Sequence, residues 1–141
     1  MTMHASKACC ETAPGAFADD YQTKGTYETY SDLSCYVTGP RGASKAIYYI
    51  YDVFGFQPQT TQGADILSSS GYLVVVPDFF VGKPMKPEWF ARDTDENSLN
   101  IQKFRAGIAD PKPYIEKVYV ILDELKKAYP KVDTWGAIGC E

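Results

Sequence analysis

The stretch GYLVVVPDFF, residues 71–80, decides the fold that this sequence predicts. Its centre, 72–77, is continuously apolar rather than alternating, which is typical of a β-strand that is buried on both faces. A similar run, AIYYIY, occupies residues 46–51. Residues 59–70 between the two runs predict a short helix, and Gly71 follows at a position where helices commonly end in the left-handed conformation. Strand, helix and strand in this order predict a βαβ unit with two parallel central strands.

The sequence before this unit predicts an antiparallel hairpin. Residues 26–30 and 33–38 combine alternating character with β-branched and aromatic residues, and a polar Ser-Asp pair separates them. Residues 1–25 show no apolar periodicity, so we expect them to form an N-terminal arm. A length of 141 residues suits one domain, which we place at 26–141.

The sequence after this unit predicts further helices and a last strand. Apolar residues recur every three or four positions between Asp110 and Tyr129, which indicates an amphipathic helix. Two shorter helices are expected at 88–91 and 99–106, and residues 132–139 predict a strand. The alternation of strands and helices predicts an α/β fold: a mostly parallel sheet of about five strands, helices on both faces and an antiparallel N-terminal hairpin.

Composition and charge exclude several classes of function. Hydrophobic residues make up 45% of the chain and charged residues 23%, which is typical of a folded globular protein. A net charge of -4 gives no basic surface for nucleic acid or anionic lipid, and no apolar run reaches the length of a membrane helix. We therefore expect a cytoplasmic protein with no nucleic-acid or membrane partner. The sequence has four cysteines, Cys9, Cys10, Cys35 and Cys140. They lack the spacing of a metal site, and we expect them to be reduced thiols. We expect no metal or other cofactor.

Three stretches at the predicted carboxyl edge of the sheet resemble the dienelactone hydrolases, also called carboxymethylenebutenolidases. They are YYIYDVFG at 48–55, GYLVVVPDFF at 71–80 and WGAIGC at 135–140. The resemblance implies the α/β-hydrolase fold, in which the third stretch leads into the sharp turn that carries the nucleophile. It also implies hydrolysis of a small ester or lactone substrate without a cofactor.

In this family a cysteine attacks the carbonyl carbon. A histidine, which an aspartate orients, activates this cysteine. The resemblance makes Cys140 the candidate nucleophile and implies that both partners follow residue 141. The only histidine of this sequence is His4. Cys140 directly follows Gly139, so an alignment without gaps to the family pattern Gly-x-Cys-x-Gly places Cys140 one position early and Glu141 on the nucleophile position. We therefore expect a C-terminally truncated form that is inactive alone.

Other residues near this edge are candidates for the same site. The resemblance implies that Asp52 helps to hold the resting thiol. It also implies that the Val53 amide donates a hydrogen bond to the oxyanion. For Asp52 the alternative is a cap of the following turn, and for Cys140 it is an inert thiol. The candidate substrate pocket consists of Phe54, Phe79, Phe80 and Lys83, although most aromatic residues of the chain are expected in the core.

Two functions from different classes remain open at this point. The first is the ester or lactone hydrolase just described. The second is a noncatalytic α/β module that binds a ligand or dimerises. Strand 132–139 would have an open edge in the predicted sheet, and such edges readily pair with another chain. The sequence therefore also predicts possible self-association through residues 132–139.

Overall fold

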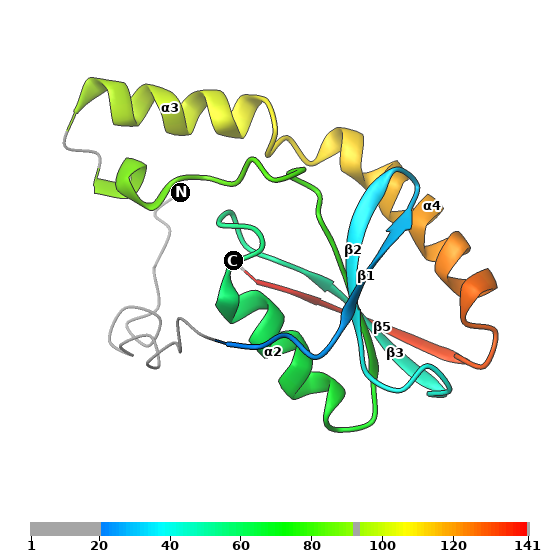
Figure 1. Ribbon diagram of the computed structural model, residues 1–141. Coiled ribbons are helices and arrows are strands. Elements are labelled where there is room, and N and C mark those ends of the chain that lie inside the picture. Colours follow the sequence, from blue (N-terminus) through cyan, green and yellow to red (C-terminus); the bar gives the residue numbers. More distant parts are fainter. Residues whose placement is uncertain (1–20, 92–93, 141) are drawn as a thin grey trace.

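A five-stranded sheet forms the centre of the structure, a computed structural model that describes residues 21–91 and 94–140 (Figure 1). The strands are β1 (Thr26–Tyr30), β2 (Leu33–Thr38), β3 (Lys45–Ile50), β4 (Leu73–Pro77) and β5 (Thr134–Gly139). Their order across the sheet is β1-β2-β4-β3-β5. The predicted hairpin and the parallel pairing of β3 with β4 are both present.

The sheet is mixed, however, and the prediction of a mostly parallel sheet was correct only in part. β2 runs antiparallel to both of its neighbours, β1 and β4, whereas β3 is parallel to β4 and to β5. The reason is that the hairpin joins the βαβ unit through its second strand. Because β2 lies between β1 and β4, the sheet contains two antiparallel and two parallel pairings.

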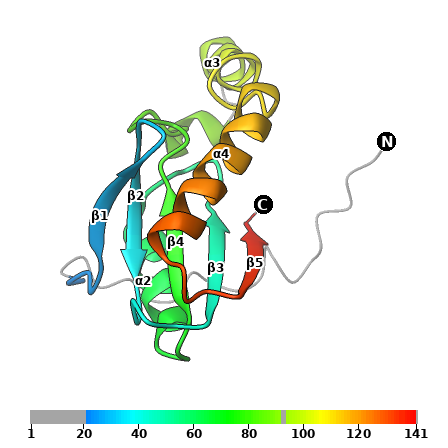
Figure 2. The same ribbon diagram turned by 90° about the vertical axis from the view of Figure 1, so that its right-hand side faces the viewer.

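Helices cover both faces of the sheet, as predicted. Figure 2 shows α4 (Lys112–Ala128) in front of the strands and α2 (Pro58–Ser68) behind them. Helix α3 (Asp95–Ala106) and the 3₁₀ turn η1 (Pro87–Ala91) lie beyond the carboxyl ends of β3, β4 and β5. None of the helices in the described part of the chain is long and apolar enough to cross a membrane.

The strand register fixes which side chains face each helix. β4 is buried along its whole length, and Val74, Val75 and Val76 have no exposed surface. Side chains alternate between faces along a strand, and directly paired residues share a face. Val74 and Val76 therefore face α2 and Val75 faces α4. Each buried valine removes apolar surface from water, which stabilises the fold by about 1.5–3 kcal/mol.

Helix α3 is longer than the sequence predicted. It begins after Thr94, whose side-chain oxygen accepts a hydrogen bond from the Asn97 amide at 3.1 Å. Asp95 and Glu96 follow in the first turn, where negative charge is favourable near the helix N-terminus. This capping pattern was present in the sequence, but it was missed because α3 has only a weak apolar stripe.

A buried carboxylate joins β2, α2 and residues 21–25. Asp65 is 2% exposed and accepts hydrogen bonds from the hydroxyls of Tyr21, Tyr36 and Thr38 at 2.7, 2.8 and 2.6 Å, and from the Lys24 amide at 3.0 Å. Burial alone would raise the pKa of Asp65, but these hydrogen bonds outweigh burial and lower the pKa below its ordinary value. The last five residues of the predicted arm 1–25 therefore contact the domain, and its first twenty lie outside the described residues.

We expect Asp65→Asn to lower the free energy of unfolding by about 2–4 kcal/mol, because the amide group points N–H donors at hydroxyls that now donate to Asp65. Urea unfolding at neutral pH measures this loss. The matched control is Asp123→Asn on the exposed side of α4, which should change stability by less than about 0.5 kcal/mol. Equal effects of the two variants would contradict the role assigned to Asp65.

The same carboxylate makes stability depend on pH. The pKa of Asp65 in the folded state lies below its value of about 3.9 in the unfolded state. Asp65 therefore makes its full contribution to the free energy of unfolding above about pH 3.9. The contribution is lost as the pH falls through the lower folded-state pKa. The difference in unfolding free energy between the parent chain and Asp65→Asn should therefore shrink in acid, which urea unfolding at a series of pH values would detect.

Candidate active site

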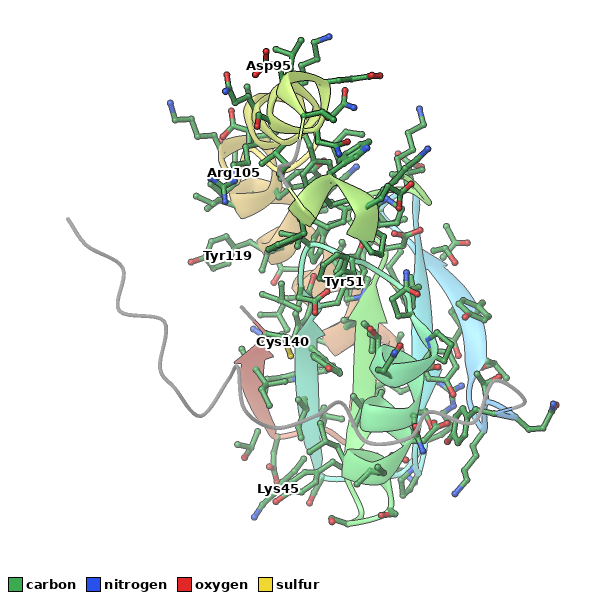
Figure 3. All side chains as sticks on the ribbon, turned by 90° about the vertical axis from the view of Figure 1, so that its left-hand side faces the viewer. Lys45, Tyr51, Asp95, Arg105, Tyr119 and Cys140 are labelled. Atoms are coloured by element: carbon green, nitrogen blue, oxygen red, sulfur yellow. The ribbon has the colours of Figure 1, made fainter. Side chains whose placement is uncertain are left out.

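The carboxyl ends of β3 and β5 bring Cys140 beside the loop that follows β3. The Cys140 amide donates to the Ile50 carbonyl at 3.0 Å and so continues the pairing of the two strands by one residue. Figure 3 shows Cys140 and Tyr51 at this same end of the sheet. The Cys140 side chain is exposed. A thiol is thus held at the edge where parallel sheets commonly bind ligands.

The Cys140 thiol has a tyrosine as its hydrogen-bond partner. Its Sγ donates to the Tyr49 hydroxyl at 3.4 Å. Burial, followed by this hydrogen bond and by the nearby charge of Asp52, raises the pKa of Tyr49 above its ordinary value. Tyr49 is 9% exposed, and its hydroxyl lies 3.6 Å from the position that a Cβ would take on Gly63 in α2. The thiol therefore lies on the α2 face of the sheet.

Sequence reasoning missed Tyr49. The run AIYYIY was read only as a buried strand, and its tyrosines were counted with the core. The usable signal was the period-two alternation of a strand, which places Tyr49 on the face opposite Tyr48 and Ile50. What the sequence did not specify was the register between β3 and β5, which brings Cys140 to that face.

Asp52 and Val53 begin the loop after β3. One carboxylate oxygen of Asp52 accepts from the Phe54 amide at 2.8 Å, and its carbonyl accepts from the Gly55 amide at 3.1 Å. Asp52 thus caps its own turn, the structural alternative considered for it. The Val53 carbonyl accepts from the Met85 amide at 2.8 Å, whereas the Val53 amide has no acceptor within the described ranges. As far as residues 21–91 and 94–140 are concerned, that N–H is available to a ligand oxygen.

The turn after Asp52 requires glycine at position 55. Gly55 has φ of +70°, and a Cβ there would lie 3.0 Å from the Pro84 Cβ. A larger residue would be strained and would push the loop away from Pro84. Gly55 therefore serves the shape of the loop that carries Asp52 and Val53.

Phe79 and Phe80 lie at the carboxyl end of β4 and pack around Tyr51. The Tyr51 hydroxyl donates to the Asp78 carboxylate at 2.7 Å and accepts from the Phe80 amide at 2.8 Å. The two phenylalanines help to line a first cavity of about 270 Å³ between the strand ends and the start of α4. Ile50 and Val118 also line it. Because Ile50 faces α4, this cavity opens on the face opposite the Cys140 thiol.

The remaining candidate pocket residues lie elsewhere. Lys83 is exposed and lines a second cavity of about 640 Å³ formed with α3 and η1. Phe54 lines neither cavity, and its ring lies 5.5 Å from that of Phe90. The structure thus places Asp52 near Tyr49, the partner of Cys140, and Val53 next to Asp52 in the same loop, where it contacts Met85. Phe79 and Phe80 lie at the first cavity, and Lys83 lies at the second.

The two cysteines in the described part of the chain should differ in reactivity. Burial raises the pKa of the Cys35 thiol to about 12, whereas Cys140 is exposed. In a Cys9→Ser/Cys10→Ser background, a disulfide-exchange reagent near pH 8 should modify Cys140 rapidly, because this thiol is exposed, and Cys35 only after unfolding. Peptide mapping by mass spectrometry identifies the modified residue. Rapid labelling of Cys35 in the folded protein would contradict its burial.

The fold and the loops at its carboxyl edge define an α/β protein with a candidate site at the ends of its parallel strands. No family model matches the sequence. A carboxymethylenebutenolidase homolog of Homo sapiens is 35% identical over 103 residues, which is 70% of this chain and 42% of that protein. An AIM2 family protein of Schizosaccharomyces pombe is 28% identical over 135 residues, which is 94% of this chain and 54% of that protein. The chain spans about half the length of the curated relatives it matches.

A solved structure supports the same fold. The protein titled m3DLH superimposes with a TM-score of 0.55 at 18% sequence identity, and the match covers 83% of this chain and 49% of that one. The chain belongs to the carboxymethylenebutenolidase, or dienelactone hydrolase, family. The resemblance found in the three carboxyl-edge stretches is confirmed.

Proposed function

We propose that these residues form part of a hydrolase that cleaves a small ester or lactone through an acyl-cysteine intermediate on Cys140. The observation that carries the proposal is an exposed thiol at the carboxyl end of β5, beside the loop after β3, in a chain of this family. The deprotonated Sγ would attack the carbonyl carbon and form a thioester while the alkoxide leaves with a proton. Water would then cleave the thioester and release the acid.

The loop after β3 supplies a group suited to this chemistry. A tetrahedral intermediate places negative charge on the former carbonyl oxygen, and a backbone N–H directed at that oxygen stabilises the charge. We assign this role to the Val53 amide, which is free of an acceptor in the described part of the chain. Asp52 then has two roles. It shapes the turn that presents this amide, and its charge helps to raise the pKa of Tyr49.

The described residues contain no histidine that could accept the proton of the thiol. The sequence contains one histidine, His4, which lies outside the described residues. Tyr49 does not fill this role, because its raised pKa keeps the hydroxyl protonated at neutral pH. We therefore propose that turnover requires a histidine that the described residues do not supply, together with an acid that orients it, and that the chain is inactive alone.

The proposal predicts acylation without turnover. Treated with 4-nitrophenyl acetate, the Cys9→Ser/Cys10→Ser chain should acquire at most one acetyl group on a thiol, at Cys140, and should release no further nitrophenol above the buffer rate. Intact mass, peptide mapping and absorbance measure these outcomes, and Cys140→Ala in the same background is the matched control. Steady-state turnover that Cys140→Ala abolishes would overturn the requirement for added groups. An unmodified Cys140 under conditions that acylate the unfolded chain would overturn its assignment as nucleophile.

The exposed edge of β5 supports a second proposal, that two copies of the chain associate through residues 132–139. β5 pairs with β3 on one side, and no other strand of residues 21–91 and 94–140 pairs with it. The Cys140 amide points to β3, so by alternation the amides of Trp135, Ala137 and Gly139 point to the open side. The small residues Gly136, Ala137 and Gly139 leave this edge accessible to the backbone of an antiparallel second copy.

Ala137→Pro tests this second proposal. Proline removes the outward amide of residue 137 but none of the amides that donate to β3, so the fold should persist while pairing through the edge is lost. Sedimentation velocity should show concentration-dependent dimers of the parent chain and monomers of Ala137→Pro. A parent chain that stays monomeric over the whole concentration range would overturn self-association.

A further inference from the structure

Strand β5 is largely uncovered, both along its outer edge and on its two faces. Figure 2 shows it as the last strand on its side of the sheet, and the four consecutive residues 136–139 are exposed. The pairing of two copies through this edge, as proposed above, buries these residues and continues the sheet into the second copy. The register of that pairing decides which side chains of the two copies meet.

The backbone groups of β5 select one antiparallel register. Trp135, Ala137 and Gly139 direct their amides to the open side, whereas the Asp133 amide donates to the Ser44 carbonyl at 2.8 Å. In an antiparallel pair, residues with outward groups lie opposite each other and exchange two hydrogen bonds. Centring the pair on Ala137 places Trp135 opposite Gly139 and uses all three outward residues of each copy. A shift by two residues in either direction leaves one of the three opposite a position outside β5.

The side chains of β5 complement one another in this register. Directly opposite residues share a face of the sheet. Trp135 then lies opposite Gly139 on the α4 face. Ile138, which is 40% exposed, lies opposite Gly136 on the α2 face. Each large side chain meets a glycine, and the small Ala137 faces its own copy on the twofold axis. A symmetric dimer requires a self-complementary patch of this kind.

We infer that the second copy supplies part of the candidate active site. Thr134 and Cys140 lie six positions apart on one strand, so both face α2. In the register centred on Ala137, Thr134 of the second copy lies directly opposite Cys140, with about 4.5–5.5 Å between the two Cβ atoms. The Thr134 hydroxyl donates to the Asp133 carboxylate at 2.7 Å, so its oxygen remains able to accept a hydrogen bond from the thiol or from a ligand. The arrangement rests on the self-association proposed above, and it gives each dimer two shared sites.

A disulfide between the two copies tests the register. In a Cys9→Ser/Cys10→Ser background, oxidised glutathione should link Thr134→Cys to Cys140 of the second copy, because opposite residues come within the Cα separation of about 4.4–6.8 Å that a disulfide spans. The glutathione disulfide takes up the two electrons and two protons that the thiols lose. The same two positions within one chain are about 20 Å apart, so the bond joins two chains. Mass spectrometry without reduction detects the covalent dimer and maps the bond.

Gly136→Cys is the matched control on the same face of the strand. In the register centred on Ala137 it lies opposite Ile138, so it should not form a disulfide with Cys140. A register shifted by two residues toward the carboxyl end would allow that bond, and Val132→Cys reports the opposite shift in the same way. The parent background should not link Cys140 to Cys140, because these thiols lie at opposite ends of the paired strands.

Charge at the twofold axis gives a second test that needs no thiol. Residue 137 faces its own copy only in this register. Ala137→Glu and Ala137→Lys should therefore each weaken association, since like charges directly opposite each other are unfavourable. An equimolar mixture should form mixed dimers with an affinity about fivefold higher than that of either variant alone. Sedimentation velocity measures these affinities, and the difference should decline at high salt.

The outcomes separate the register from self-association. A dimeric chain in which Thr134→Cys forms no disulfide with Cys140, or in which the mixed and unmixed residue-137 variants associate equally, would overturn the shared site and leave self-association in place. A chain that stays monomeric in sedimentation and forms none of these disulfides would overturn both. None of these measurements requires hydrolysis, so a failure of the proposed hydrolase chemistry is a separate result.

Discussion

The rest of the structure depends on the complete burial of β4. Its three valines have no exposed surface, because β2 and β3 flank the strand and α2 and α4 cover its faces. The backbone N–H and C=O groups of a buried strand need hydrogen-bond partners on both sides of the strand. The hairpin therefore pairs with one side of β4, and β3 pairs with the other side. The remaining order of the sheet follows, since β5 is left to pair with the free side of β3.

The parallel direction of β3, β4 and β5 is what assembles the candidate site. Parallel strands end at the same edge, so the loops after β3 and β4 and the residue after β5 meet there. Side-chain alternation then divides that edge between the two faces of the sheet. Cys140 and Tyr49 lie on the α2 face, whereas the cavity that contains Phe79 and Phe80 opens toward α4. The hydrolase chemistry that we propose would take place at the α2 side of the edge.

Two clusters of hydrogen bonds join residues that are far apart in the sequence. Asp65 gathers hydroxyl and amide donors from β2 and from residues 21–24 around one buried carboxylate. On the other face of the sheet, Glu28 of β1 accepts from the hydroxyls of Tyr30 and Tyr129 and forms an ion pair with Arg41 at 2.7 Å. These contacts tie the edge strand and the chain before it to α2 and to the end of α4. Neither cluster was visible in the sequence, where each residue lay in an ordinary polar context.

The sequence by itself determined the elements, the central βαβ unit and the family, because these depend on local periodicity and on short contiguous stretches such as 71–80. It also identified Asp52, Val53 and Cys140 as residues of one edge. Only the tertiary structure decided the mixed direction of the sheet, the partner of the Cys140 thiol and the separation of Lys83 from Phe79 and Phe80. The physical reason is that each of these depends on which strands pair and in which register, and on how α3 and η1 pack. Those are contacts between distant residues, and no local pattern in the chain specifies them.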